Sequence, residues 1–521
     1  MADKPAPSLL KSGFIVASFT LLSRVLGLAR DIVFARFIGA GDGADAFFIA
    51  FKIPNFMRRL FAEGAFAQAF VPVLSEYREQ GSHAAVKALI DRVAGSLGLV
   101  LTLVTAVAVL ASPVMATLFA PGFTGDAAKF QLTSDLIRIT FPYLMLISLT
   151  GFAGSILNSY DRFAVPALTP VLLNVSLISA AVLASDGMVE PVVGLAYGVL
   201  AAGVVQLVFQ LPFLASLHLL PSPKLDWQDS GVRKILGLMV PALFGVSVSQ
   251  INLLLDTVLA SLLPGNSVSW LYYSDRLAEL PLGVFAIAIS TVILPKLSRQ
   301  HTGSHERKFS DTLDWALRLI VFIGLPASLA LIVLAEPILA TLFLYGKTTA
   351  LDISMSSLSL QAYASGLLAF MLIKVLAPGY YARQDMKTPV KIGVIAMVSN
   401  MVLNLLFVIP LHFYFQVGHV GLALATAVSA YLNAFLLYRG LRRERVYTPK
   451  AAWTKSVLRC VSANVAMLAV LLFALNGSQD WIHALWFERV THLAVICVAG
   501  LSVYVAALWI GGVRLRDFKA S

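Results

Sequence analysis

Arginine and lysine crowd into the first two apolar stretches of the chain, at six positions: Arg24, Arg30, Arg36, Lys52, Arg58 and Arg59. A cation inside a bilayer costs about 2.5–3.5 kcal/mol even on mild scales, so it usually faces a partner or a water-filled cavity. Arginine suits phosphate, because its planar guanidinium donates two parallel hydrogen bonds and stays charged. The cluster therefore predicts a cavity that holds an anion.

Three of these cations are the best candidates to line that cavity. Arg24 and Arg30 lie six positions apart, and Gly27 between them lets the expected helix bend and turn both toward one side. Arg58 follows Pro54-Asn55, where we expect the helix to break or kink.

The other three cations have a simpler alternative. Arg36, Lys52 and Arg59 either snorkel to the membrane interface or pair with nearby acids. The acids in reach along the sequence are Asp31, Asp45, near the outer end of the second span, and Glu63. We favour this alternative for Arg36 and Lys52.

A smaller charged cluster lies in the second half of the chain. Asp275 and Glu279 are four positions apart and share one helix face, and Arg276 and Glu279 are three apart. One interpretation is a locally neutralised triad that sets helix packing. The other is a gate, in which Asp275 or Glu279 reaches the arginines of the first two spans when the protein closes.

Polar residues in three later spans suggest a possible cation site. Asp256, Asn400, Asn404 and Thr426 offer the hard oxygen atoms that Na⁺ prefers. More often, Asn and Thr within spans hydrogen-bond neighbouring helices. The coupling source stays open between Na⁺, H⁺ and the membrane potential.

Sequence motifs for catalysis are missing. There is no GxxxxGK[ST] loop for a nucleotide, no HExxH, no GxSxG and no Cys/His cluster. We therefore expect a transporter that is not an enzyme, has no cofactor and does not use ATP directly.

The amino-acid composition indicates that the charged residues described above lie on membrane-spanning helices. Of 521 residues, 58% are hydrophobic and 13% charged, against about 25% charged in a soluble protein. We predict an all-α polytopic membrane protein with fourteen spans, of which the first two are the least apolar. Their expected centres are Leu22, Phe51, Leu101, Met145, Leu177, Val204, Val248, Ile287, Leu325, Leu367, Met401, Ala427, Val470 and Ala499.

The loops predict the orientation. With a cytoplasmic N-terminus, the loops and tails on the cytoplasmic side hold 25 Lys and Arg, and the opposite loops hold three: Lys129, Lys347 and Arg489. The positive-inside rule then predicts both termini in the cytoplasm and an even number of spans. It also accounts for the net charge of +11 without a nucleic-acid partner.

A weak internal repeat organises the spans. Three pairs of matching segments recur in the same order, at offsets of 225, 223 and 223 residues: Asp31 with Asp256, Pro72 with Pro295, and Pro166 with Pro389. The repeat unit holds six spans, an even number, so the two copies are parallel and surround a central cleft, as in alternating-access transporters. We divide the chain into lobes 1–222 and 223–446, with two further spans in 447–521.

Six stretches resemble one family. They are SRVLGLARD at Ser23–Asp31, ADAFF at Ala44–Phe48, PNFMRRLFAEGAF at Pro54–Phe66, SWLYYSDRL at Ser269–Leu277, VLAPGYY at Val375–Tyr381 and KTPVK at Lys387–Lys391. Together they resemble the MurJ (MviN) family of bacterial lipid II flippases, in the multidrug/oligosaccharidyl-lipid/polysaccharide exporter superfamily. The resemblance runs through the whole chain.

The resemblance implies a function. Members of the family carry the undecaprenyl-pyrophosphate-linked peptidoglycan precursor, lipid II, across the bacterial inner membrane from the cytoplasmic to the periplasmic leaflet. The anion would then be a lipid pyrophosphate, and 447–521 would form a groove for the lipid tail. The family's functional residues resemble Arg24, Arg30, Asp45, Arg58, Arg59, Asp275, Arg276 and Glu279 here.

Sodium coupling is less well supported, because members with a sodium site carry an acid near position 404, where this chain has Asn404. The alternatives are a flippase for another polyprenyl-pyrophosphate oligosaccharide, a multidrug or cation exporter, or a membrane scaffold. A drug exporter should line its cavity with acids and aromatic rings, and a scaffold needs neither the repeat nor the buried charges.

Overall fold

The computed structural model describes residues 9–60, 66–185, 190–302, 306–450, 453–476 and 480–514. Within these residues all regular secondary structure is helical. The chain forms two compact units, Met1–Val268 and Ser269–Ser521. The predicted divisions after residues 222 and 446 follow the repeat, and they stay a prediction.

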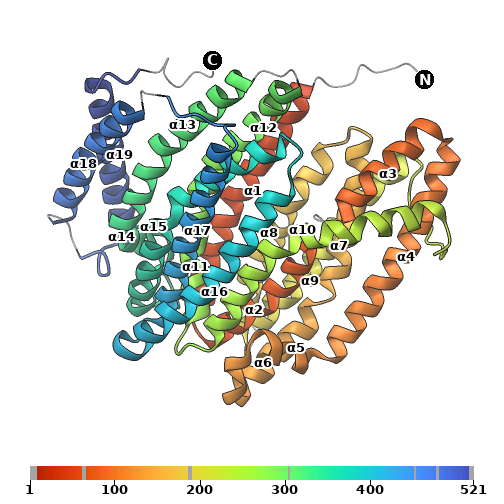
Figure 1. Cartoon of the computed structure of the whole chain (residues 1–521). Helices are drawn as coiled ribbons and strands as arrows, with labels where there is room; N and C mark the ends of the chain where they lie inside the picture. Colours follow the sequence, from red (N-terminus) through yellow and green to blue (C-terminus); the bar gives the residue numbers. More distant parts are fainter. Residues whose placement is uncertain are drawn as a thin grey trace. The chain divides into compact units, whose positions relative to one another are not determined.

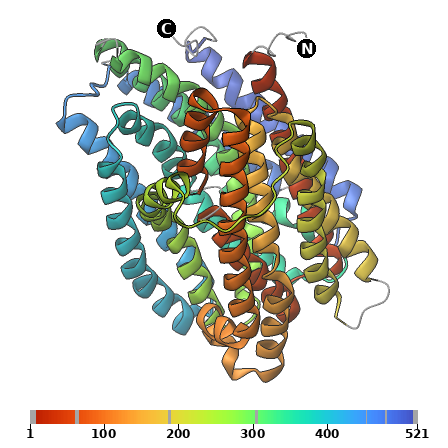
Figure 2. The same cartoon turned by 90° about the vertical axis from the view of Figure 1, so that its right-hand side faces the viewer.

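The first unit contains ten α-helices and a short 3₁₀ helix among its described residues (Figure 1). They are α1 (Leu9–Phe37), α2 (Asp42–Met57), α3 (Ala67–Gln80), α4 (His83–Leu110), α5 (Ser112–Phe119), η2 (Pro121–Gly125), α6 (Ala127–Thr140), α7 (Tyr143–Ser159), α8 (Ala164–Ser185), α9 (Pro191–Ser216) and α10 (Ser230–Ser261). Helix α1 packs along α8, and α8 along α9. The antiparallel pair α3 and α4 faces the viewer in the orange part of Figure 2.

The second unit begins within α11. Its helices are α11 (Ser267–Pro281), a π-helical turn η3 (Leu282–Ala286), α12 (Ile287–Thr302), α13 (Glu306–Val333), α14 (Ala335–Phe343), α15 (Ala350–Tyr381), α16 (Lys387–Phe415), α17 (Gly418–Arg443), α18 (Trp453–Asn476) and α19 (Trp486–Ile510). Helix α17 packs against both α15 and α16, and α18 packs against α19 and α13.

Short polar residues start several of these helices. The side chains of Ser82, Asp126 and Asp229 accept hydrogen bonds from the first backbone N–H groups of α4, α6 and α10. Thr349 and Asp352 form a capping box at the start of α15. Such caps satisfy backbone donors that have no partner inside the helix.

Among the residues that the structure describes, eleven helical segments are long and apolar enough to cross a membrane. All fourteen predicted span centres fall within helices. The three predicted spans outside the eleven lie on α1, α2 and α10, which carry buried charged residues such as Arg30, Asp45 and Asp256. The chain is therefore an all-helical, multi-span membrane protein.

The helices pack closely against one another within each unit. Gly366 on α15 lies so near α17 that an added Cβ would come within 2.6 Å of the Cα of Ala427. Phe70 and Phe152 stack edge to face between α3 and α7, with ring centroids 5.1 Å apart. Small residues at such crossings let helix backbones approach closely, as membrane helices commonly do.

Candidate functional site

Arg30 is held in place on α1 by two buried partners. Its Nε and Nη2 donate to Oδ1 of Asp31 at 3.0 and 2.7 Å, and its Nη1 donates to Oδ1 of Asn174 on α8 at 3.1 Å. The Asn174 amide also donates to the carbonyl of Ser23 at 3.0 Å. Arg30 is only 6% exposed, so its charge is balanced and its orientation is restricted. The sequence predicted that Arg30 lines a cavity, but no local pattern pointed to Asn174 as its partner.

Arg24 differs from Arg30. It lies on the same helix and is half-buried. Among the residues that the structure describes, none forms a hydrogen bond or ion pair with its guanidinium. A half-buried arginine without a protein partner is well suited to take an external anion.

The sequence predicted a break or a kink at Pro54-Asn55, and the structure shows no break there. Helix α2 continues through Pro54 to Met57 and changes to π-helix at 58–60. Pro54 has no N–H for the carbonyl of Ala50, and Thr140 on α6 donates its hydroxyl to that carbonyl instead, at 3.1 Å. Arg58 and Arg59 lie on the widened turn, Arg58 half-buried and Arg59 exposed.

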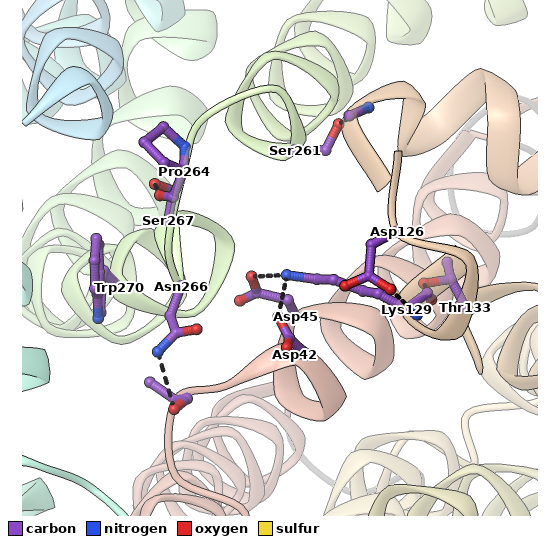
Figure 3. Close-up of polar contacts among 12 residues, drawn as sticks. Asp42, Asp45, Asp126, Lys129, Thr133, Ser261, Pro264, Asn266, Ser267 and Trp270 are labelled. Atoms are coloured by element: carbon purple, nitrogen blue, oxygen red, sulfur yellow. Dashed lines mark hydrogen bonds and ion pairs between the residues drawn. The ribbon is translucent and has the colours of Figure 1, made fainter. Parts of the chain in front are cut away.

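Asp45 pairs with Lys129, a cation that the sequence predicted to lie in a loop. Lys129 on α6 reaches Oδ2 of Asp45 at 3.0 Å and Oδ1 of Asp42 at 2.8 Å (Figure 3). Its ammonium also lies 4.2 Å from the ring centroid of Phe123. Asp45 and Lys129 are 1% and 8% exposed. The pair joins α2 to α6.

The charged triad of the second unit is partly neutralised within α11. Arg276 lies 3.6 Å from Oε2 of Glu279, and its guanidinium lies 5.0 Å from the ring centroid of Tyr272. Asp275 and Glu279 are both partly exposed. The arrangement is compatible with either of the two interpretations of the triad.

Three of the four residues of the suggested cation site are linked by hydrogen bonds. Asn400 donates to the Thr426 hydroxyl at 3.3 Å, and Asn404 donates to Oδ1 of Asn400 at 3.1 Å. Asn400 also donates to Ser429 at 3.4 Å, which ties α16 to α17. Asp256 is buried on α10 in the first unit, so its convergence with the other three stays a prediction. No cluster of three or more His, Cys, Asp or Glu side chains able to hold a metal occurs among the described residues.

Two cations assigned to loops by hydropathy are buried on helices. Lys129 is one, and Arg489 on α19 is the other, with its Nη1 donating to the carbonyl of Ala340 at 2.8 Å. Both lie near helix starts, where hydropathy does not separate a loop from a helical turn. Asn174 and Lys129 had no signal in the local sequence, because their partners are distant along the chain.

Long apolar helices together with buried arginines define a class: a polytopic membrane transporter. The comparisons with known proteins name its family. A family model described as lipid II flippase MurJ matches residues 34–491. A probable lipid II flippase MurJ of Vibrio cholerae is 52% identical over 522 residues, 98% of each chain, and the lipid II flippase MurJ of Burkholderia cenocepacia is 40% identical over 98% of this chain and 99% of its own.

Solved structures agree with this assignment. The chain is similar to a solved lipid II flippase MurJ in an inward closed conformation, with a TM-score of 0.80, 28% identity, and coverage of 95% of this chain and 98% of that one. An inward-facing multidrug-resistance MATE transporter of the MOP superfamily shares the fold, with a TM-score of 0.68 and 16% identity over 83% of this chain and 98% of its own. The chain belongs to the MurJ family of lipid II flippases, so it is a transporter and not an enzyme.

Proposed function

We propose that this flippase moves lipid II from the cytoplasmic to the periplasmic leaflet of the inner membrane by alternating access. The pyrophosphate of the substrate is held by Arg24, Arg30 and Arg58, with Arg59 and Arg276 completing the polar surface. Asp45, buried and paired with Lys129, contributes to this site by supporting α2 from within. Arg24 carries this proposal, because it is half-buried on α1 and no described residue pairs with it. Arg30, fixed by Asp31 and Asn174, provides a second, pre-oriented guanidinium.

Two parallel lobes of six spans each, followed by two extra spans, make the cleft that this mechanism needs. The helix bounds support the repeat. The starts of α5 and α14, of α6 and α15, and of α8 and α16 are each 223 positions apart. The π-helical turns at 58–60 and 282–286 begin 224 positions apart. A parallel repeat of this kind is a common basis for transport by rocking of two halves.

Polar contacts recur in the same places. In the first half Asp45 on α2 pairs with Lys129 on α6. In the second half Trp270 on α11 donates its indole N–H to Asp352 on α15 at 2.8 Å. Asp45 and Trp270 are 225 positions apart, and Lys129 and Asp352 are 223 apart, so the two contacts are equivalent in the repeat. An ion pair in the first half is replaced by a hydrogen bond in the second, which supports a common ancestral arrangement of six spans.

The gate and the energy source complete the proposal. Asp275 or Glu279 closes against the arginines of the first half, and both termini lie in the cytoplasm. Transport draws on an ion gradient or on the membrane potential, with Asp256, Asn400, Asn404 and Thr426 as the candidate site if the ion is Na⁺. The lipid tail lies against α18 and α19, which follow the second lobe.

The test is replacement of Arg24. Arg24→Ala should abolish growth rescue in cells depleted of their own flippase, while the protein reaches normal membrane levels. Arg24→Lys should rescue only partly, because an ammonium cannot make the two parallel hydrogen bonds of a guanidinium. Arg36→Ala is the matched control, since Arg36 lies on the same helix, is exposed and should be dispensable. Full rescue by Arg24→Ala would disprove the proposed role.

A further inference from the structure

Two buried aspartates occupy the same position of equivalent helices. Asp91 lies on α4 and Asp314 on α13, 223 residues apart. They are 4% and 0% exposed. A buried carboxylate is costly unless it is paired and hydrogen-bonded, so each must have a specific set of partners.

Asp91 binds the segment that follows the last helix of the first repeat. Its Oδ1 accepts a hydrogen bond from the backbone N–H of Ser222 at 2.7 Å, and its carbonyl accepts from the N–H of Lys224 at 2.9 Å. The ammonium of Lys87, one turn earlier on α4, pairs with the same carboxylate. The segment therefore lies directly on the surface of α4.

Neighbouring residues on α4 extend this contact as far as α10. One turn after Asp91, a Cβ added to Gly95 would lie 2.1 Å from the carbonyl oxygen of Lys224, so only glycine leaves room for the segment. Arg92 pairs with Asp229 at 2.5 Å and with Asp226 at 3.4 Å. Asp229 is the residue that caps α10. The whole connection from 222 to the start of α10 is thus fastened to α4.

Asp314 makes the equivalent contact after the second repeat. Its Oδ1 accepts from the hydroxyl of Tyr447 at 2.9 Å, the indole N–H of Trp453 at 2.6 Å and the backbone N–H of Lys450 at 3.3 Å. Nε of Arg318, one turn later on α13, lies 3.0 Å from its other oxygen. Burial and the adjacent Asp314 carboxylate raise the pKa of Tyr447, so its hydroxyl stays protonated and donates.

The surrounding contacts again extend to the next helix. The backbone N–H of Thr448 donates to Ser310 on α13 at 3.0 Å, and the ammonium of Lys450 lies 3.0 Å from Asp311. Trp453, bound to Asp314, is the first residue of α18. In the first half α4 therefore binds the segment that follows the repeat, and in the second half α13 binds the equivalent segment through the equivalent aspartate.

We propose that Asp91 and Asp314 are positioning residues for transport. Asp91 fastens the exit segment of the first repeat to α4, so a movement of α4 is passed to α10. Asp314 fastens the exit segment of the second repeat to α13, so a movement of α13 is passed to α18. The proposal takes lipid II transport from family membership and does not depend on the arginine clamp.

The first experiment replaces each aspartate by asparagine, which keeps the size but removes the charge that holds Lys87 or Arg318. Hydrogen exchange of the purified proteins should rise in 222–229 for Asp91→Asn and in 447–453 for Asp314→Asn, each without change in the other segment. Lipid II flipping in proteoliposomes should fall about tenfold in both. The matched control is Asp135→Asn, a partly exposed aspartate of α6 in an i,i+3 pair with Arg138, which should change neither measurement.

A disulfide in place of the Asp91–Ser222 hydrogen bond distinguishes a role in positioning the segment from a role in folding the protein. Asp91→Cys combined with Ser222→Cys, in a Cys497→Ser background, should flip slowly when reduced and recover when a disulfide replaces the lost hydrogen bond. Cys460 is buried and is left in place. Faster exchange of the segments with wild-type flipping would overturn the proposal, as would equal rates for the oxidised and reduced double variant. Loss of Arg24 would instead abolish flipping without changing exchange in either segment.

Discussion

Lys129 forms ion pairs with two aspartates that differ sharply in exposure. The Asp45 side chain is 1% exposed and that of Asp42 is 69% exposed, although their distances to the ammonium are similar. Solvent screens the outer pair, whereas burial makes the inner pair sensitive to the loss of either charge. Distance alone therefore does not decide which pair matters for stability.

This contrast gives a prediction about stability. Asp45→Asn should lower the free energy of unfolding by about 3 kcal/mol, because the buried ammonium loses its buried counterion. Asp42→Asn should cost less than about 1 kcal/mol. Thermal unfolding in detergent measures both.

A double variant provides the check at this site. Asp45→Leu with Lys129→Met removes both charges and should be more stable than either single change, because no uncompensated charge remains. Additive losses in the double variant would show that the two residues do not depend on each other.

At the scale of elements, α2 remains helical past Pro54, and another helix supplies the hydrogen bond that the proline cannot donate. Thr140 on α6 donates to the carbonyl of Ala50, which Pro54 cannot serve. The π-helical turn that carries Arg58 and Arg59 follows directly. The position of these arginines thus depends on a contact between α2 and α6.

We predict that Thr140→Val destabilises the protein by roughly 1–3 kcal/mol, because it leaves a buried carbonyl without a donor. The same change in a Pro54→Ala background should cost less, since residue 54 then offers its own N–H to Ala50. Unfolding measurements on the four proteins of this cycle test the idea. An equal cost of Thr140→Val in both backgrounds would rule out the compensation.

At the scale of the whole molecule, the proposed gate predicts a shift between inward-open and outward-open states. Neutralising Asp275 or Glu279 removes an attraction present only when the gate is closed, and the shift cannot exceed that difference in contact energy. Single cysteines placed along the proposed cleft should change their reactivity in Asp275→Asn and Glu279→Gln. Glu336→Gln, an exposed acid at the start of α14, serves as the control. Unchanged reactivity in both gate variants would count against the gate.

The energy source is a second property of the whole molecule. Moving one elementary charge through 100 mV is worth about 2.3 kcal/mol, so a charged cavity that changes its exposure to the two sides of the membrane responds to the membrane potential. Collapsing the membrane potential with an ionophore should stop flipping while ATP is still present. Asp256→Asn should remove any sodium dependence if the ion site is real. Transport that survives both treatments would exclude this energy source.

The charged residues of the proposed site could be picked out from the sequence, because charges in apolar stretches are visible without a structure; their role in binding stays a prediction. Arg24, Arg30 and Arg58 stood out for that reason, and Arg24 proved half-buried without a protein partner among the described residues. The spacing of Asp275, Arg276 and Glu279 predicted one helix turn, and α11 contains it. Helical periodicity and hydropathy are local properties of the sequence, so they can be recognised without knowledge of contacts between distant residues.

The sequence by itself determined the helical membrane class and the family, since these follow from composition and local motifs, and all fourteen expected span centres lie within helices. Only the tertiary structure decided how the charges are paired. Lys129 appeared to be a loop cation, and it is buried against Asp45, 84 positions away. Asn174 holds Arg30 from 144 positions away, and Asp91 holds Ser222 from 131. Such pairs form because buried polar groups must find partners wherever the packing of distant helices brings them together, and no local pattern carries that information.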